Sequence, residues 1–252
     1  MYRSYVLHQI NLNDIARIER WYAFKHGPEI ARRYGPWLAR FESYRPVEAP
    51  EDAKAYGATN YLCTEGIWRS MPDPSDRGFL GMTQPPKHAC PFSCMVPVQP
   101  DYDFKGGDDA PDDHFVLRWV QLIKFPSGVD RKEADDWFTR VFAPAACRQE
   151  SLNRFFAFKA VEEDIHVAGH WAEGKITPDY QGNPDDHRWD RVIEMWFDDF
   201  EGWKAFVNSG LPTPEWAETE KYPFVKPVSE FVSAFLLEFP AYDWLKTERA
   251  FI

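Results

Sequence analysis

The chain has 252 residues, a formal net charge of −11 and an aromatic content of 17%. This length suffices for one large domain or for two units of about 110 to 125 residues. The acidic balance repels phosphate backbones and anionic lipids, which argues against nucleic-acid and membrane partners. The sequence shows no bilayer-length apolar run and no signal peptide at residues 1–8, and its 4 cysteines are too few for a disulfide framework. We therefore expect a cytoplasmic protein with reduced thiols.

Hydrophobic periodicity and turn residues predict the elements of the first half. The expected order is a strand at 4–11, helical segments at 14–26 and 27–34, and strands at 38–47, 58–68 and 93–98. A Pro-rich segment at 72–91 interrupts this order and is long enough to be functional. These elements indicate a first unit over residues 1–103.

A segment rich in glycine and acidic residues, 104–113, has the composition of a linker. Beyond it the order of elements starts again. We expect a strand at 114–125, a helix at 130–148, strands at 153–161 and 188–197, a helix at 200–208 and a last strand at 230–239. The second unit is therefore predicted to span residues 114–252.

A repeated motif supports duplication. The segment from Trp21 to Pro28 matches the segment from Trp137 to Pro144 in its aromatic pair and its proline. In each copy a strand follows that contains an Arg-Phe pair, Arg40-Phe41 in the first copy and Arg154-Phe155 in the second. We therefore expect Trp21 and Pro28 to superimpose on Trp137 and Pro144.

The motif and the strand that follows it resemble the EthD-like members of the dimeric α/β barrel superfamily. The likeness is greatest over residues 119–161 and 189–209, including the segment Glu194–Asp198. The resemblance implies an α+β fold of two ferredoxin-like units whose antiparallel sheets pack as a barrel. In this superfamily the sheets usually pair across a homodimer, which we expect here, although a tandem chain could also pair them within itself.

The resemblance places a histidine in the middle of the motif, and the two copies differ there. The first copy carries His26 and the second carries Phe142. An imidazole exchanges protons near neutral pH, so this asymmetry favours a working site in the first half. The alternative is a histidine that makes a local hydrogen bond at a helix end.

His8 is a second candidate, because it shares a strand face with apolar neighbours as either a core residue or a pocket base. Hydroxyl and carboxylate groups on the next strands could converge with an imidazole, to stabilise an oxyanion and orient the base. The candidate catalytic residues are His26, His8, Tyr44 and Tyr61. The candidate substrate-binding residues are Trp21, Tyr22, Arg40, Glu65, Trp68 and Trp196.

Metal and nucleotide sites find little support in the sequence. His88, Cys90 and Cys94 lack a fourth ligand, and His166 and His170 lie in a segment of poor helix formers. The chain carries no glycine-rich dinucleotide loop, Walker loop or Gly-x-Ser-x-Gly motif. We expect neither metal nor organic cofactor.

The high aromatic content indicates either a ring-rich core or a pocket for a flat apolar ligand. With the resemblance, it leads us to expect a cofactor-free lyase or isomerase acting by His and Tyr acid-base chemistry on a bulky aromatic molecule, of phenolic, lignin-derived or polyketide type. The alternatives are a noncatalytic binding or accessory protein of a catabolic operon and a cofactor-free monooxygenase.

Overall fold

The computed structural model describes residues 1–9, 15–56, 61–70, 90–105, 116–126, 128–161, 189–216 and 230–249. These residues form two antiparallel five-stranded sheets with short helices. The predicted α+β class is therefore confirmed. None of the helices in these ranges has the length and hydrophobicity needed to cross a bilayer.

The first half contains four strands of the first sheet and the helical motif. Its strands are β1 (Tyr2–Gln9), β2 (Leu38–Tyr44), β3 (Tyr61–Trp68) and β4 (Cys90–Pro97). Between β1 and β2 lie α1 (Ile15–Trp21), the π-helix η2 (Tyr22–His26), α2 (Gly27–Tyr34) and a 3-10 turn, η3 (Gly35–Trp37). A second 3-10 segment, η4 (Glu51–Tyr56), follows β2.

The second half repeats this order. Its strands are β6 (Leu117–Lys124), β7 (Arg154–Lys159), β8 (Arg191–Phe197) and β9 (Glu230–Leu237). Between β6 and β7 lie α3 (Arg131–Trp137), the π-helix η5 (Phe138–Phe142) and α4 (Ala143–Cys147), and α5 (Phe200–Val207) follows β8. The order β2-β3-β1-β4 corresponds to β7-β8-β6-β9, which is the strand order of a ferredoxin-like unit.

Each half donates an edge strand to the sheet of the other half. β5 (Tyr102–Lys105) follows the first half but pairs with β7, whereas β10 (Tyr242–Asp243) follows the second half and pairs with β2. The helix α6 (Trp244–Arg249) then packs beside α2. Phe104 and Lys105, predicted as the start of the linker, therefore belong to a strand, and the rest of the linker lies outside the described residues.

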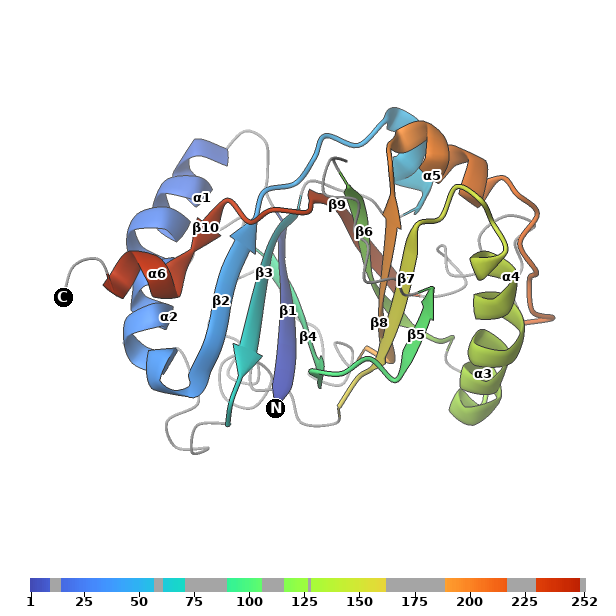
Figure 1. Cartoon of the computed structure of the whole chain (residues 1–252), viewed down its shortest axis with the longest axis horizontal. Helices are drawn as coiled ribbons and strands as arrows, with labels where there is room; N and C mark the ends of the chain where they lie inside the picture. Colours follow the sequence, from blue (N-terminus) through green and yellow to red (C-terminus); the bar gives the residue numbers. More distant parts are fainter. Residues whose placement is uncertain are drawn as a thin grey trace.

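The two sheets face each other between outer layers of helices (Figure 1). The helices α1, α2 and α6 cover the first sheet, and α3, α4 and α5 cover the second. Every β-strand alternates its side chains between a helix-covered face and the space between the sheets. The core between the sheets includes Tyr5, Leu7, Val120 and Phe158.

The helical motif has the same irregularity in both halves. Trp21 and Trp137 each end an α-helix, and five residues of π-helix follow in each copy. Pro28 and Pro144 then lie in the first turn of the next helix. A proline has no N–H to donate and its ring crowds the carbonyl four residues earlier, so a local widening of the helix accommodates it. The predicted correspondence of the two motifs thus holds element by element.

Strand pairing shows which residues occupy the same position in the two sheets, and we call such residues counterparts. The phenylalanines of the two Arg-Phe motifs fix this register, because Phe41 lies opposite Gly66 and Phe155 lies opposite Met195. Gly66 and Met195 are therefore counterparts, and so are the residues immediately before them, Glu65 and Glu194. The same register gives the counterparts Arg3 and Arg118, His8 and Ile123, Ser43 and Ala157, Thr64 and Ile193. The helical motif adds Trp21 and Trp137, Tyr22 and Phe138, His26 and Phe142.

Gly27 permits α6 to approach the first half closely. A Cβ at this position would lie 2.7 Å from ring carbons of Trp244. In the second half Ala143 corresponds to Gly27 and Phe104 corresponds to Trp244. The larger residue at the first position is thus matched by a smaller ring at the second. We expect Gly27→Ala to destabilise the fold by about 1 to 3 kcal/mol through overpacking. Adding Trp244→Phe should recover part of this loss in urea unfolding, whereas simple additivity of the two changes would contradict the steric account.

Candidate active site

Two imidazoles meet on the helix-covered face of the first sheet. His8 points from β1 toward the helices, and His26 ends the π-helix η2. Their ring centroids lie 5.8 Å apart with the ring planes at 79°. His8 is buried, with 5% of its surface exposed, whereas His26 is partly exposed. The outer imidazole can therefore contact a ligand, while the inner imidazole lies directly behind it.

Two further rings hold the imidazoles in place. Trp21 stacks on His26 with centroids 4.6 Å apart and planes at 24°. Tyr22 lies 5.3 Å from the ring of His26 and 5.4 Å from the ring of His8. Both aromatic residues come from the point where α1 becomes η2. The π-helix thus gathers four rings around one spot, as π-helical turns often do at functional sites.

The hydroxyl of Tyr22 is fixed by a polar group on the sheet. It accepts a hydrogen bond of 3.1 Å from Ser43 Oγ and lies in hydrogen-bonding contact with Thr64 Oγ1. Trp244 Nε1 donates to Ser43 Oγ at 2.7 Å. Burial raises the pKa of Tyr22 above its ordinary value, and its hydrogen bonds offset only part of this effect. Tyr22 therefore stays protonated and positions the imidazoles rather than acting as a base.

The second half replaces all of these polar groups with apolar ones. The counterparts of His8, His26, Tyr22, Ser43 and Thr64 are Ile123, Phe142, Phe138, Ala157 and Ile193, each with 0% of its surface exposed. The second half therefore has the same backbone arrangement with apolar side chains in place of the polar ones. Packing alone does not require the imidazoles, which makes the first half the candidate site.

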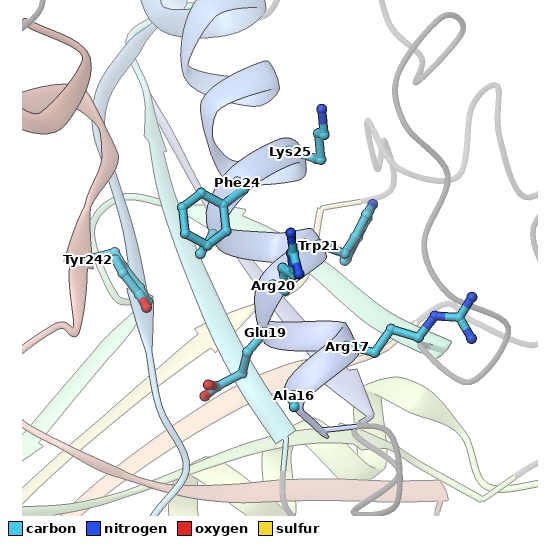
Figure 2. Close-up of a pocket in the computed structure, with 9 residues that line it drawn as sticks. Ala16, Arg17, Glu19, Arg20, Trp21, Phe24, Lys25 and Tyr242 are labelled. Atoms are coloured by element: carbon cyan, nitrogen blue, oxygen red, sulfur yellow. The ribbon is translucent and has the colours of Figure 1, made fainter.

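A groove of about 860 Å³ runs beside this cluster (Figure 2). Its lining comes from α1, η2 and β10, and includes Trp21, Phe24 and Tyr242. Phe24 is 73% exposed, and Trp21 joins the groove to the His26 ring on which it stacks. This volume is within the range of small-molecule sites.

The other predicted site residues do not converge on the imidazoles. Tyr44, Arg40 and Glu65 project into the space between the sheets, as does Trp196, so the expected convergence of tyrosine, carboxylate and histidine is wrong for these residues. Trp68 shares the helix-covered face but lies at the far end of β3, where it donates to Ser4 Oγ at 3.0 Å. Tyr61 begins β3, but its side chain lies outside the described residues.

The space between the sheets contains a buried charge quartet, of which only Glu65 was predicted from the sequence as a site residue. It consists of two pairs of counterparts, Arg3 with Arg118 and Glu65 with Glu194. Arg118 donates to Glu65 at 2.7 Å and to Glu194 at 2.8 Å, and Arg3 donates to Glu65 at 2.5 Å. The sequence does contain a sign of this quartet, because both arginines and both glutamates recur at matching strand positions of the two halves.

The quartet is suited to joining the halves and poorly suited to proton transfer. Burial alone would raise the pKa of Glu194, but Arg118 and Arg3 outweigh it and lower the pKa to about 2. The same two arginines lower the pKa of Glu65 against the effect of burial. Tyr5 and Trp196 also donate to Glu194, at 3.2 Å and 2.7 Å. A carboxylate stabilised in this way is a weak base, so the quartet is a poor candidate for proton transfer.

Most of the candidate metal ligands lie outside the residues that the structure describes. His88, His166 and His170 are outside the described residues, as is the side chain of Cys90, and Cys94 is buried between the sheets. Within the described ranges, no three His, Cys, Asp or Glu side chains lie close enough together to hold a metal ion.

Comparison with known proteins gives one family match. Residues 1–83, which contain the imidazole pair and its helical motif, match the chalcone isomerase N-terminal domain family. A search of curated proteins finds no match.

Solved structures show weak similarity. One is chlorite dismutase from Candidatus Nitrospira defluvii in complex with imidazole, at 10% identity, 95% coverage of this chain, 91% of that chain and a TM-score of 0.47. Another is an anthrone oxidase-like protein, at 10% identity, 94% coverage of this chain, 90% of that chain and a TM-score of 0.47. Similarity at this level carries no argument about activity.

Proposed function

We propose that this protein is a cofactor-independent isomerase or lyase that uses His26 and His8 to move protons on a bulky aromatic small molecule. The observation that carries the proposal is the replacement of both imidazoles by fully buried apolar residues in the otherwise matching half. The family match over residues 1–83 supports it, because chalcone isomerases act on an aromatic compound.

The proposed proton transfer follows from the positions of the two imidazoles, with His26 partly exposed and His8 buried behind it. An isomerisation of this kind removes a proton from one atom of the substrate and returns a proton to another, so it needs an acceptor and a donor. His26, the partly exposed imidazole, takes the proton from one atom of the substrate and, as the imidazolium, returns a proton to the other atom. His8, behind it, faces the same ring and stabilises the imidazolium or relays the proton. Acid-base catalysis by a positioned side chain contributes a factor of about 10² to 10⁴ in rate.

The aromatic side chains decide which molecules fit. The exposed ring of Phe24 offers apolar surface on η2, and the largely buried ring of Trp21 also lines the groove and stacks on His26. A flat substrate gains from stacking and from burial against such rings. We also propose that the chain is an EthD-like protein, on the evidence of the Trp-aromatic motif alone.

The proposal is tested by proton exchange in D2O. The protein is incubated with a panel of chalcones and phenolic compounds, and products are analysed by mass spectrometry and NMR. We expect at least one substrate to acquire solvent deuterium at carbon, at a rate that depends on His26. Tight ligand binding with no exchange or turnover across the panel would instead indicate a noncatalytic binding protein.

A further inference from the structure

The groove beside Trp21 carries positive charge. Arg17 precedes Trp21 by four residues and Lys25 follows it by four, a spacing that places side chains on one face of a helix. Figure 2 shows Arg17, Trp21 and Lys25 projecting to the same side, with Arg20 between them toward the viewer. The ring that stacks on His26 is thus flanked by a cation on either side.

These cations make no ion pair within the part of the chain that the structure describes. Arg17, Arg20 and Lys25 are exposed and lie on the groove. Glu19 is the one acidic residue of the groove lining and is paired with Arg45 at 3.2 Å. The groove is therefore positive at one edge although the whole chain has a net charge of −11.

The charge belongs to the half with the imidazoles. In the helical motif, Arg17 corresponds to Glu133, Arg20 to Asp136 and Lys25 to Val141. Trp21 and Trp137 are the same residue in both copies, so the difference concerns the flanking charges and not the ring. The first half thus carries both the cations and the imidazoles, and the second half has neither at the matching positions.

We propose that the site selects an aromatic substrate that bears a carboxylate, with the carboxylate attracted by the positive charge of Arg17 and Lys25 and the ring directed along Trp21 toward His26. This inference rests on the proposed function and names its substrate class. An arginine and a lysine flanking an aromatic surface suit an anionic head on a flat ring, because charged hydrogen bonds are the stronger ones and the ring supplies apolar contact.

The test is calorimetric binding of matched pairs of ligands. Benzoates, cinnamates and diaryl carboxylates are compared with their methyl esters at low and high salt. We expect the free acids to bind at least tenfold more tightly than the esters, with the difference reduced by salt. Arg17→Gln and Lys25→Gln should each weaken acid binding by about five- to tenfold, and the double variant by more, with ester binding unchanged.

Arg140→Gln supplies the matched control, because it removes an exposed cation from the corresponding helical motif of the second half. Its acid binding should equal that of the wild type. Equal affinity for acids and esters would overturn the inference, as would acetate binding as tightly as the aryl acids. Full charge dependence with normal turnover in His26→Ala would instead overturn the proposed mechanism and leave the binding inference intact.

Discussion

Replacing His26 with alanine is expected to lower kcat/KM by a factor of about 10² to 10⁴ while leaving the unfolding free energy nearly unchanged. His26 is partly exposed at the end of η2, so its truncation leaves little cavity. His8→Ala should also reduce turnover, with a larger loss of stability because His8 is buried among rings. Steady-state kinetics and thermal melts of both variants measure these effects.

Phe142→Ala is the matched control, because it truncates the counterpart of His26. Phe142 is completely buried and packs against Phe138 and Trp137. Its removal should cost about 3 to 5 kcal/mol of stability through lost burial and cavity formation, with kcat/KM close to normal below the melting temperature. A His26→Ala protein with near-normal kcat/KM would place the chemistry elsewhere.

Replacing Arg118 with leucine is expected to destabilise the protein by about 3 to 5 kcal/mol, because it removes the arginine that donates to both Glu65 and Glu194 and leaves the two buried carboxylates with Arg3 as their counter-ion. Arg118 is 3% exposed and joins a carboxylate of each half. Urea unfolding measures the loss. Lys132→Ala, which breaks the exposed pair between Lys132 and Asp136, should change stability little by comparison.

The same quartet gives stability a defined pH dependence. The folded pKa of Glu194 is about 2, below the ordinary value of 4.5, so the native state binds its proton less tightly than the unfolded state does. Its contribution is fully present above pH 4.5 and is lost as the pH falls toward 2. We expect wild-type stability to fall in this window. An equally steep fall in Glu194→Gln would show that other carboxylates cause it.

Periodicity in the sequence located most of the elements within a few residues. The strand expected at 230–239 is β9 (Glu230–Leu237), and the helix expected at 200–208 is α5. The exchanged strands β5 and β10 were missed because each is too short to show alternation. Comparison of 100–104 with 240–244 could have found them, since both read Pro-x-Tyr-Asp-aromatic.

The candidate site was only half predictable. The contrast between His26 and Phe142 is visible in the aligned motifs, because a helix carries its register in the sequence. The contrast between His8 and Ile123 requires the strand pairing. Period two also shows that Tyr44 and Glu42 share a face, but it does not show that this face looks toward the other sheet and away from the histidines.

The central claim is tested most directly by converting the imidazoles of the first half into their counterparts. The His8→Ile/His26→Phe variant receives residues that the same frame already accommodates in the second half, so it should fold. Deuterium incorporation from D2O into the substrate is then compared with that of the wild type, under conditions where melts show both proteins folded. The account predicts that incorporation falls to the uncatalysed rate in the variant, and incorporation at the wild-type rate would contradict it.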